Sequence, residues 1–198
     1  MNRVWFALLA TAIVLSPVAA VDAEEGLPPK AFGGLKNAVE IVIDKFGVPH
    51  IYAITEPDAM FALGYMHARD RLWQMDFSRR AAQGELAEIM GESALEHDLF
   101  IRTIGLNRLA RASAERIEEH PKLYRNLKAY AWGVNSYMAE VMADDLPIEF
   151  QELQYTPEPW KIEDSLAIGK AMSWELCGSM DDLYLGTLVE KLGWDVVD

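Results

Sequence analysis

Apolar β-branched residues stand at the first, third and fifth positions of Val39–Ile43. A period of two is typical of a β-strand with one buried face. A second short apolar run covers residues 48–53, and the turn formers Asp44 and Gly47 lie between the two runs. The pattern therefore predicts a β-hairpin.

From Thr55 onward the apolar residues follow helical spacing. Thr55 and Asp58 form a capping-box pattern, and Pro57 suits a first helical turn. Gly84 supplies a stop signal. These signals predict one long helix that ends just before Gly84.

The two halves of this predicted helix differ in character. The first half is apolar on nearly every side, which predicts deep burial. The second half carries charges, many of them three or four residues apart: Arg69, Asp70, Arg71, Asp76, Arg79 and Arg80. Two interpretations stay open, namely buried charges paired along the helix or a solvated polar face.

Helical patterns continue through the rest of the chain. Helices are predicted over residues 85–91, the second half of 93–116, 121–142, 164–178 and 183–192, with a proline-punctuated loop over 144–163. The 121–142 helix carries the clearest core-facing stripe. In the 164–178 helix, Gly169 is expected to let a neighbour approach closely. The predicted fold class is α+β, mainly helical with one short hairpin.

Composition narrows the class of protein. The 198 residues contain 18 Lys and Arg and 31 Asp and Glu, a formal net charge of −13, which argues against a nucleic-acid or anionic-membrane partner. A hydrophobic fraction of 51% excludes a disordered chain. The single cysteine excludes an internal disulfide framework and a cysteine-rich zinc site. The length suits one domain or two small ones.

Residues 1–23 have the pattern of a secretory signal peptide. Arg3 precedes an apolar stretch at residues 4–15 that is too short to span a bilayer comfortably. Cleavage is expected after Ala23, with Ala20 as the alternative site, and an uncleaved membrane anchor is the competing interpretation. The prediction is a domain over residues 24–198, located in the periplasm or outside the cell, with no stable membrane insertion after cleavage.

A complete active site is not evident from the residues alone. No serine lies in a Gly-x-Ser-x-Gly elbow, and nothing local supports Cys177 as a nucleophile. His67 and Asp70 have one-turn spacing, which is common by chance in helices. Asp181 and Asp182 fall in a predicted break between helices, where they could hold a hard cation such as Ca²⁺ or simply form a polar turn. We therefore expect no catalytic residue in this chain.

Several blocks together resemble the penicillin acylase (penicillin amidase) family of N-terminal-nucleophile hydrolases. The hairpin contains a Gly-Val-Pro-His-Ile run at residues 47–51. Residues 62–76 read ALGYMHARDRLWQMD, a long and specific match to the block that follows in the family. Residues 79–91, the pair Asp98 and Arg102, and the later Pro-Trp at 159–160 continue the pattern. The resemblance covers most of residues 39–193.

The resemblance implies an enzyme made as one precursor, with a signal, an α segment, a spacer and a larger β segment. The precursor cleaves itself and frees a serine at the start of the β chain, whose own α-amino group serves as the base. This chain looks like the α segment, incomplete at its C-terminus and inactive alone. Its expected partners are the β chain, in a heterodimer with an αββα sandwich, and a small acylated amine such as a penicillin or an acyl-homoserine lactone. The alternative is an inactive binding or structural module.

The family also implies two sites within an α segment. Residues 172–176 correspond to one wall of the acyl pocket, with Trp174 as the leading substrate-facing residue and Met172 and Glu175 next; an ordinary core or surface role for Trp174 is the alternative. A structural calcium ion is expected at Asp182 and Asp181. The family has a glutamate at that position, and a one-residue shift would place Leu183 there. No organic cofactor is expected.

Overall fold

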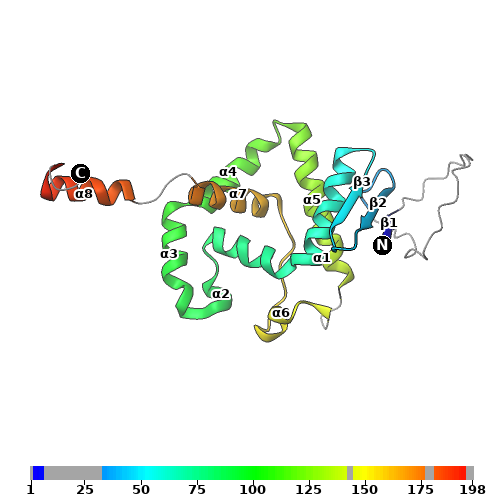
Figure 1. Ribbon diagram of the computed structural model, residues 1–198, viewed down its shortest axis with the longest axis horizontal. Helices are drawn as coiled ribbons and strands as arrows, with labels where there is room; N and C mark the ends of the chain where they lie inside the picture. Colours follow the sequence, from blue (N-terminus) through cyan, green and yellow to red (C-terminus); the bar gives the residue numbers. More distant parts are fainter. Residues whose placement is uncertain (1, 7–32, 142–144, 177–180, 195–198) are drawn as a thin grey trace, which may run out of the picture.

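The computed structural model describes residues 2–6, 33–141, 145–176 and 181–194. Within them a helical body carries a small sheet at one end, and α8 lies at the opposite end (Figure 1). The elements in chain order are β1 (Asn2–Phe6), β2 (Val39–Ile43), β3 (Pro49–Tyr52), α1 (Glu56–Gln83), α2 (Ala87–Met90), the 3-10 helix η1 (Gly91–Ala94), α3 (Leu95–Ile104), α4 (Leu106–Ile117), α5 (Pro121–Glu140), α6 (Ile148–Glu152), α7 (Ile162–Leu176) and α8 (Asp181–Leu192). The predicted α+β class, mainly helical with a short hairpin, is confirmed.

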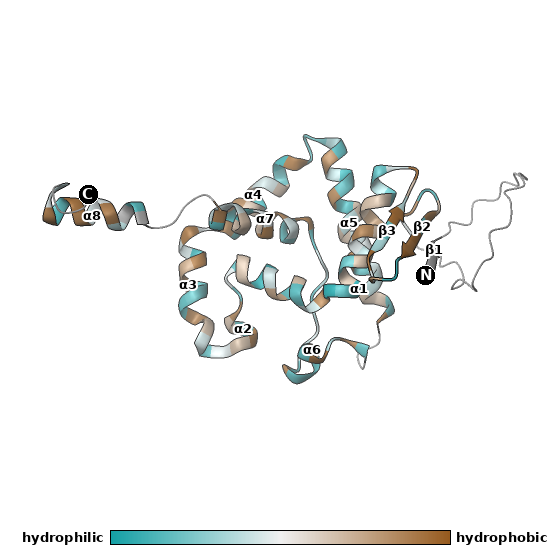
Figure 2. Ribbon diagram, in the orientation of Figure 1, coloured by the Kyte–Doolittle hydropathy of each residue, from teal (hydrophilic) through white to brown (hydrophobic). Residues whose placement is uncertain are grey.

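The sheet is antiparallel with the strand order β1-β2-β3. β2 and β3 form the predicted hairpin, and the strand pattern buries Val39 and Ile41 completely. In the turn, the Asp44 carboxylate accepts hydrogen bonds from the backbone N–H groups of Phe46 and Val48, and Gly47 adopts a left-handed φ of 82°. In Figure 2, β2 is mostly brown, the colour of apolar residues.

β1 falls inside the predicted signal peptide. Residues 2–6 pair with β2, and the rest of residues 1–23 lies outside the described residues. The signal peptide therefore stays a prediction. Among the described helices, none is both long enough and apolar enough to cross a bilayer.

α1 begins and ends where the sequence predicts. The Thr55 hydroxyl caps its N-terminus by accepting the N–H of Asp58, and Gly84 ends it in the left-handed conformation with φ 72°. The helix bends at Arg71, whose φ of −144° is not helical, and the sequence gives no signal for this bend. As predicted, the first half is buried, with Phe61, Ala62 and Met66 at 1% exposure or less.

α1 packs against α5 through two glycines. Gly64 of α1 faces the backbone of Tyr130, and Gly133 of α5 faces the backbone of Phe61. A Cβ at either position would overlap the opposing carbonyl oxygen. The two helices therefore lie closer together than they could with any other residue at these two positions. This contact places the core-facing stripe of α5, with Ala131 and Val134 buried, against α1.

Several sequence expectations are wrong in detail. The 93–116 region is helical almost throughout, and Gly105 with φ 84° divides it into α3 and α4. The predicted 144–163 loop contains α6. α8 begins at Asp181, so the aspartate pair lies in a first helical turn and not in an irregular break. A Cβ on Gly169 would meet none of the described residues within 4 Å, so this glycine serves no close approach there.

We predict that Gly133→Ala destabilises the protein by at least about 2 kcal/mol, because the new methyl group must displace the Phe61 carbonyl. Thermal unfolding checks this as a fall in Tm. Gly169→Ala is the matched control, because it adds the same group to an open helical position and is expected to be neutral or stabilising by about 0.4–1 kcal/mol. Equal Tm values for the two variants would contradict the close-contact account.

Candidate functional site

Four charged side chains are buried where the end of α1 meets the start of α7. Asp76, Arg79, Arg80 and Asp164 are exposed by 1%, 5%, 7% and 5% respectively. We call them the charge cluster. Two carboxylates and two guanidinium groups balance formally, and burial without such pairing would cost several kcal/mol per ion. Of the two interpretations of the second half of α1, the structure therefore supports paired charges for these residues.

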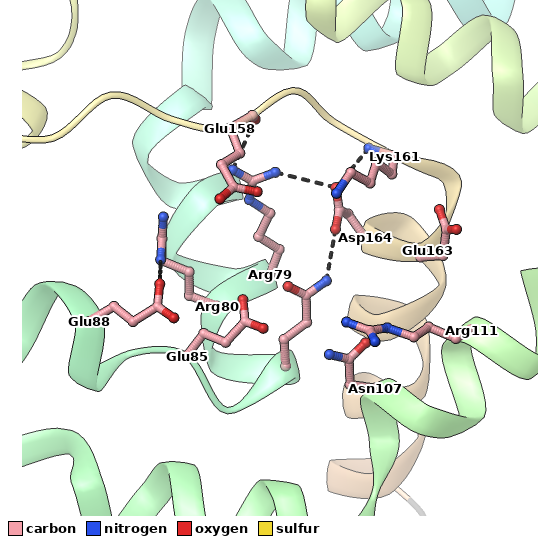
Figure 3. Close-up of a pocket in the computed structure, with 11 residues that line it drawn as sticks. Arg79, Arg80, Glu85, Glu88, Asn107, Arg111, Glu158, Lys161, Glu163 and Asp164 are labelled. Carbon is pink, nitrogen blue, oxygen red and sulfur yellow. Dashed lines mark hydrogen bonds and ion pairs between the residues drawn. The ribbon is translucent and has the colours of Figure 1, made fainter.

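Arg79 makes most of the connections in the charge cluster. Its Nε donates to Oδ1 of Asp76 at 2.8 Å, and its Nη2 donates to the same oxygen. Nη2 also donates to the Glu158 carbonyl oxygen at 3.0 Å, and Nη1 donates to Oδ2 of Asp164 at 3.3 Å. One guanidinium thereby joins α1, the loop before α7 and α7 itself (Figure 3).

Arg80 and Tyr155 complete the surroundings of Asp76. Arg80 Nε and the Tyr155 hydroxyl both donate to Oδ2 of Asp76, at 2.9 Å and 2.8 Å. Burial alone would lower the pKa of Arg80, but Asp76 and Glu88 outweigh it and that pKa lies above its ordinary value. Burial, together with the hydrogen bond to Asp76, raises the pKa of Tyr155. Arg80 therefore stays charged and Tyr155 stays a neutral donor at physiological pH.

A cavity of about 360 Å³ lies beside the charge cluster (Figure 3). Its lining is strongly polar and includes Glu85, Glu88, Arg111 and Lys161. Burial, with the negative charge of Glu88 nearby, raises the pKa of Glu85. Apolar acyl groups bind in mostly apolar pockets, so this cavity does not suit an acyl chain.

The residues predicted to contact substrate lie further along α7. Met172 and Glu175, one helical turn apart, both line a smaller cavity of about 210 Å³ between α1, α3 and α7. Phe77 and Ile101 supply apolar side chains to the same cavity. Trp174 is not part of that lining and is 38% exposed. The structure thus brings two of the three predicted residues together and directs the third elsewhere.

The metal and nucleophile candidates find no complete site among the described residues. No group of three or more His, Cys, Asp or Glu there could hold a metal ion. Asp182 is exposed on the first turn of α8, while the Asp181 side chain and Cys177 lie outside what the structure describes. Asp182 could supply at most part of a calcium site, so calcium stays a prediction.

His67 has a structural partner instead of a metal partner. Its Nδ1 lies 3.0 Å from the Tyr130 hydroxyl, and their rings meet edge to face. Partial desolvation lowers the pKa of His67 although Asp70 opposes the shift, and burial raises the pKa of Tyr130 to about 12. The contact joins α1 to α5, which suits a packing role.

The residue that completes the charge cluster from outside α1, Asp164, was not predicted from the sequence as a partner of α1. Asp164 accepts from Gln83 Nε2 at 2.7 Å and from the Lys161 backbone N–H at 2.7 Å, in addition to Arg79. The second of these bonds is one half of a capping box, in which the third residue of a helix reaches back to the residue before it. An acidic residue in the first turn of the predicted 164–178 helix was the available signal, but it does not reveal a partner 85 positions earlier in the chain.

Comparison with known proteins gives consistent matches. The family model described as penicillin amidase matches residues 38–197. The acyl-homoserine lactone acylase QuiP of Pseudomonas aeruginosa is 39% identical over 86% of this chain and 20% of its own length. The penicillin acylase 2 proenzyme of Pseudomonas sp. strain SE83 is 39% identical over 73% of this chain and 19% of its own. This chain therefore spans about a fifth of the length of these curated relatives.

A solved structure matches the fold. The thermostable penicillin G acylase from Alcaligenes faecalis superposes with a TM-score of 0.67, covering 80% of this chain and 86% of that one. The sequence identity in this match is 24%, so it bears on the fold alone.

Proposed function

The chain belongs to the penicillin amidase family, and on that basis we propose that it is the α-chain portion of a secreted amide hydrolase. The family match over residues 38–197 is the observation that carries the proposal. The aligned part of this chain makes up only about a fifth of the curated relatives, which supports a larger partner segment from the same precursor. The proposed complete enzyme is a heterodimer with a β chain.

The reaction that we propose is hydrolysis of the amide bond between an acyl group and an amine. A serine at the N-terminus of the β chain attacks the carbonyl carbon, and its own α-amino group accepts the hydroxyl proton. The C–N bond breaks, the amine leaves with a proton, and water then hydrolyses the acyl-enzyme ester. In this proposal the nucleophile and the base both belong to the β chain, so the role of the present chain is in binding and not in bond breaking.

The role that we propose for this chain is to hold one wall of the acyl pocket. The candidate wall is residues 172–176 at the end of α7, hereafter the wall segment. Met172 and Leu176 are apolar and exposed by 56% and 81%, so a partner segment or an acyl group could cover them. The substrate class is an amide with an apolar acyl group, a description that penicillins and acyl-homoserine lactones share.

Export is part of the same proposal. Residues 1–23 supply the signal-peptide pattern, and the enzyme would act in the periplasm or outside the cell. The alternative function is an inactive binding or structural module with the same fold.

We expect the purified 198-residue chain to hydrolyse no acyl amide, and the complete precursor to mature and hydrolyse one. The reason is that the nucleophile and its base come from the β chain. The measurement is release of a chromogenic amine from N-acyl substrates of several chain lengths, with the two preparations side by side. Turnover by the 198-residue chain would contradict the division of roles, and an inactive complete protein would favour the binding-module alternative.

We expect Met172→Ala in the complete enzyme to change the ratio of kcat/KM between long and short acyl substrates by about tenfold, because one side chain of a pocket wall sets how well an acyl chain fills it. Trp174→Ala is made in parallel as a second variant of α7, because the Trp174 side chain does not line the cavity that Met172 lines. Met90→Ala is the matched control, as Met90 is 47% exposed on α2. An unchanged kcat/KM ratio in both α7 variants would contradict the proposal that the wall segment lines the acyl pocket.

A further inference from the structure

None of the residues of the wall segment is buried. Residues 172–176 are all exposed, and the buried residues of α7 are Asp164 and Ala167, near the start of the helix. The contacts that set the direction of α7 therefore lie within residues 164–171, before the wall segment. At a rise of 1.5 Å per residue, Met172 lies about 12 Å and Glu175 about 16 Å along the axis from Asp164. A small tilt at Asp164 consequently becomes a displacement of ångströms at the wall segment.

Two kinds of contact hold the start of α7. The first is apolar: Ala167 packs with Ala82 of α1 and Ala110 of α4, each exposed by 2% or less, and the partly buried Leu166, Ile168 and Ala171 of α7 pack against the same cluster. These apolar contacts bring the helices together but make no directional bond, so they restrict the orientation of α7 less than hydrogen bonds do. The second is polar and directional, and it converges on the Asp164 carboxylate.

The Asp164 carboxylate receives three donors, two of which come from α1. Arg79 Nη1 and the Lys161 backbone N–H donate to Oδ2, and Gln83 Nε2 donates to Oδ1 at 2.7 Å. Arg79 is itself held by Asp76 and the Glu158 carbonyl. Gln83 is the last residue of α1, and its side-chain amide donates to Asp164. Its amide thus fixes the orientation of the carboxylate and, through it, of the first turn of α7.

We propose that Gln83 is a positioning residue for acyl-chain selectivity, acting through Asp164 on the wall segment. This inference rests on the proposed amide hydrolase function. Gln83 does not touch the cavity lined by Met172 and Glu175, so its effect on substrate choice would be transmitted by the orientation of α7.

The test is Gln83→Met in the complete enzyme, a change that keeps the length and volume of the side chain and removes the donor. We expect the long-to-short kcat/KM ratio to change at least about fivefold, mainly through KM, since a displaced wall alters acyl binding. Gln151→Met is the matched control, because Gln151 is exposed on α6, donates to the Leu146 carbonyl and is remote in sequence from α7. Its ratio should stay within about twofold of the original enzyme.

Gln83→Glu supplies a second and reversible readout. A protonated glutamic acid can donate to Asp164 as the amide does, whereas the ionised form repels Asp164. Of the other charged groups that line the cavities beside position 83, the carboxylates favour the protonated form (Glu85, Glu88, Glu115, Glu158 and Glu163) and the cations favour the ionised form (Arg79, Arg80, Arg102, Arg108, Arg111 and Lys161). We expect the selectivity ratio of this variant to approach that of the original enzyme as the pH falls, while the original enzyme keeps one ratio throughout. Using a ratio cancels pH effects on the shared chemical step.

The possible outcomes distinguish failure of the positioning role of Gln83 from failure of the proposed function. An enzyme that hydrolyses acyl amides but shows the same ratio in Gln83→Met, Gln83→Glu and the control, whatever their Tm, overturns the positioning role alone. If the complete unmodified protein hydrolyses no acyl amide, the proposed function fails and the positioning role fails with it.

Discussion

The Arg79 guanidinium is the contact on which the arrangement of this chain depends, because it lies between two buried carboxylates from different helices. Asp76 is on the same helix one turn away, whereas Asp164 comes from α7. Each of these ions would carry a large desolvation cost if it were unpaired. The requirement that all of them be paired at once allows few relative placements of α1 and α7. The ion pairs thus fix the relative orientation of α1 and α7, whereas the nearby apolar contact only brings the two helices close together.

This geometry connects the packing core to the proposed function. α1 is held against α5 by the Gly64 and Gly133 contacts, and α7 is held against α1 by Asp164. The wall segment extends beyond the last buried residue of α7 and presents apolar side chains to the surface. An exposed apolar end on a firmly anchored helix suits a surface that a second segment or a substrate covers. The polar cavity beside the charge cluster is a separate feature with a chemistry unsuited to acyl groups.

Local signals in the sequence were enough for much of the fold. The hairpin, the Thr55 cap and the Gly84 stop were predictable because each depends on residues within a few positions of one another. Gly105 was overlooked as a divider of two helices, and α6 is too short to give a periodic pattern. The family was predictable from the block at residues 62–76, and the family model confirms it.

The candidate site was less predictable, for a physical reason. Sequence spacing pairs Asp76 with Arg79 and Arg80, but it cannot supply Asp164, which is brought to them only when α7 packs on α1. The expected role of Gly169 in close helix packing was wrong, because that position faces open space among the described residues while Gly64 and Gly133 make the close contact. Helical periodicity identifies the apolar face of a helix, but only the packed structure shows which neighbour that face contacts.

A double-mutant cycle between Arg79 and Asp164 tests the central contact most directly. The free energy of unfolding is measured in urea for Arg79→Met, Asp164→Asn and the double variant. We predict that Arg79→Met costs about 3–5 kcal/mol, because it leaves buried carboxylates unpaired. The double variant should cost less than the sum of the single variants by at least about 1 kcal/mol. Additive costs, with a coupling energy near zero, would contradict the conclusion that this ion pair holds α7 on α1.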